Sequence, residues 1–129
     1  MDYTNLYIDG KWQEGAGCER FDVLNPATEV VIASVASADI SDADSALDAA
    51  EAAMVLWAAQ TPRHRSEVLR KAWELMTSRL DEFAHLITLE NGKARADAMG
   101  EATYAAEFFR WFAEEAVRAD GMITHAPAS

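Results

Sequence analysis

Residues 104–121 read Tyr-Ala-Ala-Glu-Phe-Phe-Arg-Trp-Phe-Ala-Glu-Glu-Ala-Val-Arg-Ala-Asp-Gly, and they constrain the fold more than any other stretch. They predict the end of a long helix that runs from about Ala94 to Asp120 and stops at Gly121. A surface helix in a small domain has one apolar stripe and one polar face. This helix carries aromatic side chains on more than one side, so it either lines a pocket or expects a covering layer: Phe108, Phe109, Trp111, Phe112.

Two further helices are predicted upstream, each with recognisable ends. Ser41 is a candidate N-cap with Asp44 in a capping-box-like role. An apolar stripe at helical spacing follows it: Leu47, Ala50, Met54, Trp57. Thr61-Pro62 predicts the start of the next helix. That helix continues through a small kink at Asp81 and ends at the left-handed cap Asn91-Gly92.

The first 40 residues favour strands instead of helices. Asp9-Gly10 lies between two short β-prone runs, which is the pattern of a two-residue hairpin turn. Two further strands are expected at 21–24 and 30–35, joined by a turn at Asn25-Pro26-Ala27-Thr28. The predicted class is therefore α+β, with strands in residues 1–40 and helices in residues 41–121.

Composition limits the partners of this chain. It has 129 residues, and 22 acidic against 11 basic side chains give a net charge of −11. That balance argues against a surface that binds nucleic acid or an anionic membrane. No apolar run is long enough to span a bilayer, and the first residues do not form a signal peptide, so a cytoplasmic location is expected.

The sequence contains no complete set of catalytic groups. Cys18 lies in a glycine-rich loop, and no base that could activate its thiol is apparent nearby in the sequence. His64, His85 and His125 lack the spacing of metal ligands. We therefore expect no catalytic residue, no cofactor-binding residue and no metal ligand in these 129 residues.

Several stretches resemble the aldehyde dehydrogenase superfamily, in the family's order and at its spacing. They are Leu6–Trp12, Asn25–Thr28, Leu89–Lys93, Gly100-Glu101 and Phe108–Gly121. The last stretch is most similar to the succinate-semialdehyde dehydrogenase branch. Two positions depart from the family pattern. Glu29 stands where the family usually has glycine, and Ala94 stands where it often has proline.

The resemblance implies that this chain is the N-terminal fragment of a longer enzyme. Residues 1–129 would form the first part of its α/β, Rossmann-like cofactor domain, and residues 122–129 would begin its oligomerisation hairpin. The catalytic domain would be absent. So would the catalytic cysteine, the general-base glutamate and the residues that bind NAD or NADP. The intact enzyme would be a homo-oligomer acting on a small-molecule aldehyde, and the fragment alone would be inactive.

The same resemblance implies three substrate-binding residues. Phe108 and Trp111 would line the aldehyde tunnel, and Arg118 would hold the far carboxylate of a semialdehyde. Trp111 and Arg118 are seven residues apart, so a continuous helix would present both on one face. The alternatives are ordinary packing for the two aromatics, and for Arg118 a surface position that complements the helix dipole.

Two other functions stay open from the sequence. One is another aldehyde dehydrogenase branch, such as a betaine-aldehyde or general aliphatic enzyme. The other is a self-contained, non-catalytic helical interaction module, which would need a closed core without exposed aromatic side chains.

Overall fold

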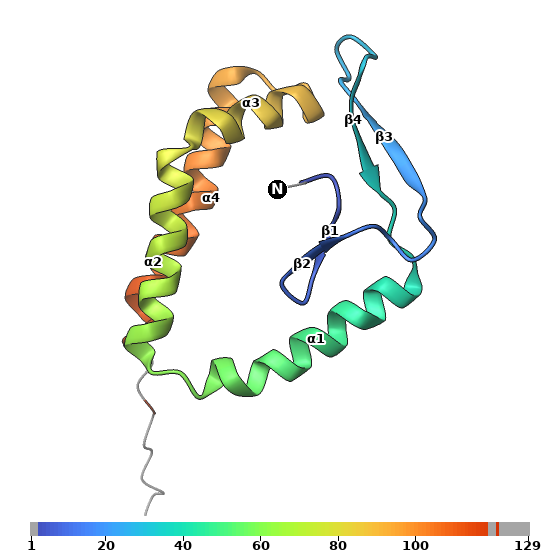
Figure 1. Cartoon of the computed structure of the whole chain (residues 1–129). Helices are drawn as coiled ribbons and strands as arrows, with labels where there is room; N and C mark the ends of the chain where they lie inside the picture. Colours follow the sequence, from blue (N-terminus) through green and yellow to red (C-terminus); the bar gives the residue numbers. More distant parts are fainter. Residues whose placement is uncertain (1–2, 119–120, 122–129) are drawn as a thin grey trace, which may run out of the picture.

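The computed structural model describes residues 3–118 and residue 121, and it places four short strands before four helices. Figure 1 shows an open arch: α1 forms the base, α2 and α4 rise along one side, α3 crosses the top, and the β3–β4 hairpin stands opposite. The elements are β1 (Leu6–Ile8), β2 (Lys11–Gln13), β3 (Arg20–Leu24), β4 (Val31–Ala36), α1 (Ile40–Ala58), α2 (Pro62–Ser78), α3 (Leu80–Asn91) and α4 (Arg95–Ala116). This order confirms the predicted class of strands followed by helices.

Both antiparallel hairpins follow from local turn chemistry. Asp9 (φ 49°) and Gly10 (φ 74°) form the predicted two-residue turn, with Ile8 opposite Lys11. In the β3–β4 turn, the side chain of Asn25 accepts a hydrogen bond from the backbone N–H of Ala27 at 2.9 Å. Glu29 then takes a left-handed conformation with φ 60°. Glycine adopts this conformation freely, so the glycine that the resemblance leads us to expect at this position would suit the turn.

Helix α1 begins two residues earlier than the sequence predicts. Asp39 is the N-cap, and it forms a reciprocal capping box with Asp42, so the prediction of Ser41 and Asp44 was wrong. A long-range contact favours this register, because the buried Asp42 carboxylate also accepts the backbone N–H of Ala16 at 3.0 Å. The loop can approach so closely because its Gly15 has no Cβ, which would clash with the carbonyl oxygen of Ser37.

The predicted kinked helix over residues 62–91 is two separate helices. Arg79 leaves the helical conformation (φ −124°, ψ 20°) and serves as the C-cap of α2 and the N-cap of α3. Figure 1 shows α3 turned across the top of the arch, where it packs against α4. Gly92 ends α3 with φ 74°, which confirms the predicted left-handed cap. A Cβ at Gly92 would lie 2.9 Å from the Pro26 ring, so this cap also fits against the β3–β4 turn.

Helix α4 ends at Ala116, with Val117 as its C-cap, so the prediction that it continues to Asp120 was wrong. Arg118 therefore follows the helix and is not part of it. The expected beginning of an oligomerisation hairpin, residues 122–129, lies outside the described residues.

The helices pack through alanines, and the described part of the chain has no closed core. Every buried apolar residue described is an alanine, and four of them line the packed face of α4: Ala98, Ala102, Ala106, Ala113. No large side chain described is fully buried. This openness contradicts a self-contained module. None of the described helices is long and apolar enough to cross a membrane.

Candidate functional site

Four aromatic side chains project from one part of α4 and form an exposed surface, here called the aromatic ridge: Tyr104, Phe108, Trp111, Phe112. Tyr104 and Phe108 meet edge to face, with ring centroids 4.9 Å apart. The ridge lines a shallow depression of about 350 Å³ together with Glu107. Trp111 is 59% exposed, so this aromatic surface is open to solvent in the described chain.

A second apolar depression lies on the other side of the Phe108–Phe112 pair. It measures about 310 Å³ and is lined by Leu69 of α2 with Phe108, Phe109 and Phe112 of α4. Trp111 does not line it. The two faces of the ridge can therefore be altered separately.

The structure brings together two of the three predicted substrate-binding residues. Phe108 and Trp111 line the same depression, as their helical spacing predicts. Sequence reasoning did not select Tyr104 and Phe112 as site residues. The available signal was the four-residue spacing of positions 104, 108 and 112, which places their side chains on one helical face.

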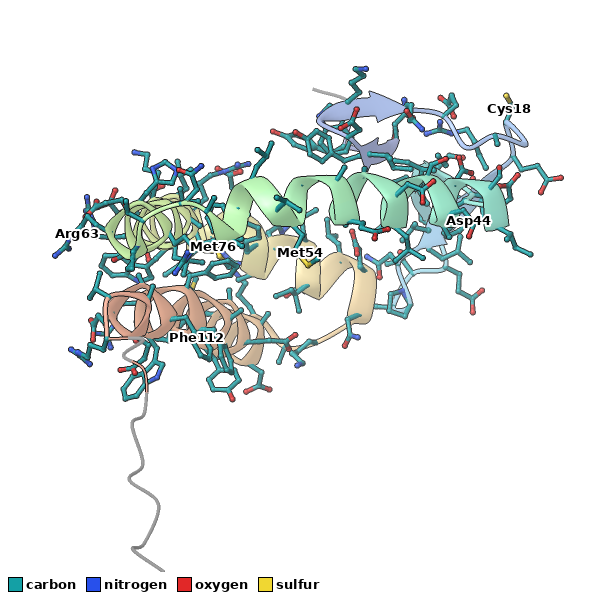
Figure 2. All side chains as sticks on the ribbon, turned by 90° about the horizontal axis from the view of Figure 1, so that it is seen from below. Cys18, Asp44, Met54, Arg63, Met76 and Phe112 are labelled. Atoms are coloured by element: carbon teal, nitrogen blue, oxygen red, sulfur yellow. The ribbon has the colours of Figure 1, made fainter. Side chains whose placement is uncertain are left out.

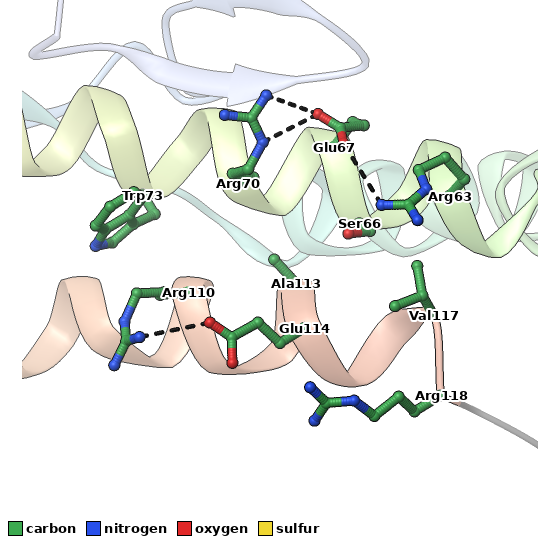
Figure 3. A pocket seen from close by; sticks show the side chains of 10 residues that line it. All are labelled: Arg63, Ser66, Glu67, Arg70, Trp73, Arg110, Ala113, Glu114, Val117 and Arg118. Atoms are coloured by element: carbon green, nitrogen blue, oxygen red, sulfur yellow. Dashed lines mark hydrogen bonds and ion pairs between the residues drawn. The ribbon is translucent and has the colours of Figure 1, made fainter.

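Arg118 does not adjoin the aromatic ridge. It lies beyond the end of α4, and its Nη1 donates to Glu115 Oε1 at 2.8 Å. It lines a separate trough between α2 and α4, together with Arg63, Trp73 and Arg110 (Figure 3). The expectation that Trp111 and Arg118 share a helical face was wrong, because the helix ends before Arg118. Its role toward a carboxylate stays a prediction.

The arginines of the trough between α2 and α4 are paired with carboxylates. Figure 3 shows this for Arg63 and Arg70 with Glu67. Arg110 donates a hydrogen bond from Nε to Glu107 Oε2 at 2.7 Å, and this bond raises the pKa of Arg110 above its ordinary value. Exposed pairs of this kind contribute little to stability. The charges of this face are therefore already paired within the chain.

No described cation lines the aromatic depression. Its one charged member is Glu107, whose carboxylate is already paired with Arg110. The described ridge can therefore provide apolar contact to a substrate, and a carboxylate would need a cation from elsewhere.

The described residues offer neither a nucleophilic centre nor a metal site. Cys18 is exposed at the tip of the β2–β3 loop, far from Phe112 in Figure 2. It has a left-handed backbone with φ 53°, and its backbone N–H donates to the Gly15 carbonyl at 2.8 Å. No group of three or more potential ligands that could hold a metal ion occurs among the residues described.

Comparison with known proteins identifies the family of the chain. The model of the aldehyde dehydrogenase family matches residues 12–129. The chain belongs to the aldehyde dehydrogenase family. It is 45% identical over 115 residues to the NADP⁺ succinate-semialdehyde dehydrogenase of Saccharomyces cerevisiae, covering 89% of this chain and 23% of that protein. It is 50% identical over 97 residues to the succinate-semialdehyde dehydrogenase of Paenarthrobacter nicotinovorans, covering 75% and 22%.

A further relative acts on a longer semialdehyde. The glutarate-semialdehyde dehydrogenase of Pseudomonas putida is 43% identical over 115 residues, which are 89% of this chain and 24% of that enzyme. The chain thus spans about a quarter of the length of the curated dehydrogenases it matches.

Solved aldehyde dehydrogenases share the open arch. The enzyme from Brucella melitensis biovar abortus superposes with a TM-score of 0.92 at 38% identity, covering 97% of this chain and 26% of that one. A betaine aldehyde dehydrogenase from Staphylococcus aureus, solved with NAD⁺, gives 0.92 at 28% identity, with 97% and 26% covered. The arch is therefore an arrangement that full-length members of this family contain.

Proposed function

We propose that this chain forms the N-terminal part of an NAD(P)-dependent dehydrogenase that oxidises succinate semialdehyde to succinate. The observation that carries the proposal is the similarity to semialdehyde dehydrogenases at 40–50% identity. Glutarate semialdehyde is the second candidate, because two glutarate-semialdehyde dehydrogenases fall in the same range. Both substrates carry an aldehyde at one end and a carboxylate at the other.

In this proposal the aromatic ridge provides part of the substrate wall. Phe108 and Trp111 are exposed and share one apolar depression, which suits the methylene groups between the aldehyde and the carboxylate. An apolar wall also excludes water from the reacting carbon. Arg118 is the proposed carboxylate partner, although in the described chain it lines the separate trough between α2 and α4 and not this depression. A guanidinium can hold both carboxylate oxygens at once.

The groups that perform the oxidation would lie in the part of the family sequence that follows. A cysteine thiolate, a general-base glutamate and the nicotinamide cofactor, which accepts the hydride, would all be held there. The yeast relative is described with NADP⁺ and the Staphylococcus enzyme with NAD⁺, so the proposal covers both cofactors. A homo-oligomeric, cytoplasmic enzyme is part of the same proposal.

Hybrid enzymes test the function. The 129 residues replace the matching quarter of the Paenarthrobacter succinate-semialdehyde dehydrogenase and, separately, of the Staphylococcus betaine aldehyde dehydrogenase. Each hybrid is assayed against its parent with succinate semialdehyde, glutarate semialdehyde and an uncharged aldehyde, with both cofactors. The first hybrid should retain its preference for succinate semialdehyde, and the second should gain kcat/KM for it relative to its parent. A transplanted quarter that lowers the preference for semialdehydes in both backgrounds would contradict the proposal.

A further inference from the structure

We propose that Tyr104 is a positioning residue that sets the chain length of the aldehyde accepted beside the aromatic ridge. Its ring holds Phe108 in place and fills one end of the depression that both residues line. The inference rests on the proposed function, because that function assigns Phe108 to the substrate wall. It adds a residue and a role, the choice between substrates that differ by one methylene group.

Overall similarity does not separate the two candidate substrates. A succinate-semialdehyde and a glutarate-semialdehyde dehydrogenase are 45% and 43% identical to this chain over 115 residues. Their substrates carry the same end groups and differ by one methylene group. A distinction between them therefore depends on the apolar wall that faces the methylene groups.

Phe108 has open space on two sides. It lines the depression of about 350 Å³ beside the ridge, and also the depression of about 310 Å³ that reaches Leu69. Its side chain is 47% exposed. A ring in such surroundings can change rotamer. A wall that rotates discriminates poorly between chain lengths, so Phe108 needs a neighbour that restrains it.

Tyr104 restrains Phe108 from the side of the ridge. It lies one helical turn earlier on the same face, and the two rings meet edge to face, with centroids 4.9 Å apart and planes at 78°. The aromatic quadrupoles favour this geometry. Tyr104 lines the depression beside the ridge and not the one at Leu69. Its contact therefore holds Phe108 on the side that faces the proposed substrate.

Tyr104 also limits the depression directly. It is the first of the lining residues along α4, so its ring occupies the N-terminal end of the depression. The contact with Phe108 is made by the ring. Phenylalanine keeps that ring and alanine removes it, so two substitutions at this position distinguish the ring from the hydroxyl.

The test uses the hybrid in which this chain replaces the matching quarter of the Paenarthrobacter enzyme. The ratio of kcat/KM for succinate semialdehyde to that for glutarate semialdehyde is measured within each preparation, so differences in active enzyme cancel. One methylene group in an apolar pocket changes kcat/KM about 10- to 200-fold. Tyr104→Ala lengthens the depression and releases Phe108, so the ratio should fall at least about 5-fold. Tyr104→Phe should change it less than about 2-fold, because the ring contact remains.

Tyr7→Ala is the matched control. Tyr7 is 61% exposed, and its ring contacts Trp12 in the β1–β2 hairpin, also with centroids 4.9 Å apart. Tyr7 does not line the depression beside the ridge. Tyr7→Ala removes the same atoms and the same kind of contact elsewhere, so the ratio should stay at the parent value. An unchanged ratio in Tyr104→Ala overturns the inference, as does an equal fall in Tyr104→Phe or in Tyr7→Ala.

A series of uncharged aldehydes separates this inference from the proposed function. Butanal, pentanal and hexanal differ by one methylene group each and need no partner for a carboxylate. A hybrid that oxidises these aldehydes but neither semialdehyde counts against the proposed function, and the butanal-to-hexanal ratio then tests Tyr104 in the same way. Thermal shifts with the same compounds replace turnover in a hybrid that binds them without oxidising them. A correctly assembled parent hybrid that binds none of them overturns both proposals.

Discussion

Glu29 shows how one residue's backbone conformation shapes the β3–β4 turn. Glu29 is left-handed with φ 60°, and an L-residue with a Cβ pays for that conformation. The turn tolerates it because Glu29 donates its backbone N–H to the Asn25 carbonyl at 2.8 Å. The contact closes the loop between β3 and β4, next to the Gly92 cap.

Replacing Glu29 with glycine should stabilise the chain. Glycine adopts positive φ without strain, although it also gains freedom in the unfolded state, so the expected net gain is up to about 1 kcal/mol. Thermal or urea unfolding of the variant measures it. Asp22→Gly, in the neighbouring strand β3, is the control and should destabilise. A lower unfolding midpoint for Glu29→Gly would contradict this prediction, because the gain in unfolded-state freedom would then outweigh the relieved backbone strain.

Arg118→Ala tests the carboxylate role. In the Paenarthrobacter hybrid, its kcat/KM for succinate semialdehyde should fall about 10- to 150-fold if Arg118 binds the carboxylate, since a charged hydrogen bond is worth about 1.5–3 kcal/mol. An uncharged aldehyde of similar length should lose little. Arg63→Ala, which alters the same trough from α2, is the control. Equal losses on both aldehydes would mean that Arg118 supports the fold and not the specificity.

Among the elements, α1 shows how a helix end depends on both local and distant partners. The hydroxyl of Ser41 and the backbone N–H of Asp42 donate to the Asp39 carboxylate and hold the pKa of that group below its ordinary value. The Ala16 N–H secures the other half of the capping box through Asp42. The start of α1 is therefore linked to the β2–β3 loop.

The cap of α1 should weaken in acid. Because the folded-state pKa of Asp39 is lowered, its contribution is present above the ordinary aspartate pKa and is lost as pH falls through the lowered value. Helicity and unfolding midpoints followed from about pH 5 downward should decline less steeply in Asp39→Asn, which keeps a capping oxygen. Asp44→Asn is the control and should follow the parent chain. Identical acid profiles for Asp39→Asn and the parent would exclude this carboxylate as a source of the pH dependence.

At the scale of the whole molecule, packing through alanines leaves the arch without a large buried side chain among the described residues. Helix α4 packs against α2 and α3 through its alanine face. Its aromatic ridge is exposed, and so are three apolar side chains on one face of α1: Leu47, Met54, Trp57. Contiguous patches of this kind usually mark an interface.

The isolated chain should self-associate. Each buried aromatic side chain is worth roughly 1.5–3 kcal/mol, so a few of them can hold two copies together. Sedimentation velocity over a concentration series measures the association. Phe108→Asp should shift the chain toward monomer, and the exposed Lys71→Asp should not. A parent chain that stays monomeric at high concentration would show that the exposed aromatic side chains do not drive self-association.

The isolated chain should not oxidise aldehydes. The one cysteine of the chain, Cys18, is exposed in the β2–β3 loop and lies far from Phe112 of the aromatic ridge in Figure 2. Purified chain is incubated with succinate semialdehyde and either cofactor, and absorbance of the reduced cofactor is followed. The Paenarthrobacter enzyme serves as the positive control. Turnover that scales with this chain would contradict the assignment of catalysis to the remaining part of the family fold.

Local signals in the sequence determined the hairpin at Asp9-Gly10, the cap at Gly92, the shared depression of Phe108 and Trp111, and one apolar face of α1. That face carries Leu47, Ala50, Met54 and Trp57. Each of these depends on residues within a few positions of one another, so sequence spacing decides it. The family followed in the same way from the resemblance of short, ordered motifs, and the comparison confirmed it.

Tertiary structure decided what depends on distant contacts. The hydrogen bond from the Ala16 N–H to Asp42 fixes where α1 begins. The chain turns at Arg79, and α3 then packs on α4. Helix α4 ends before Arg118, which therefore lies away from the aromatic ridge. Ser41 and Asp39 are equally good caps by residue type, and only the surrounding chain distinguishes them. The open side of the arch also depends on tertiary structure. An apolar stripe predicts that a helix face is covered, but it does not specify what covers that face.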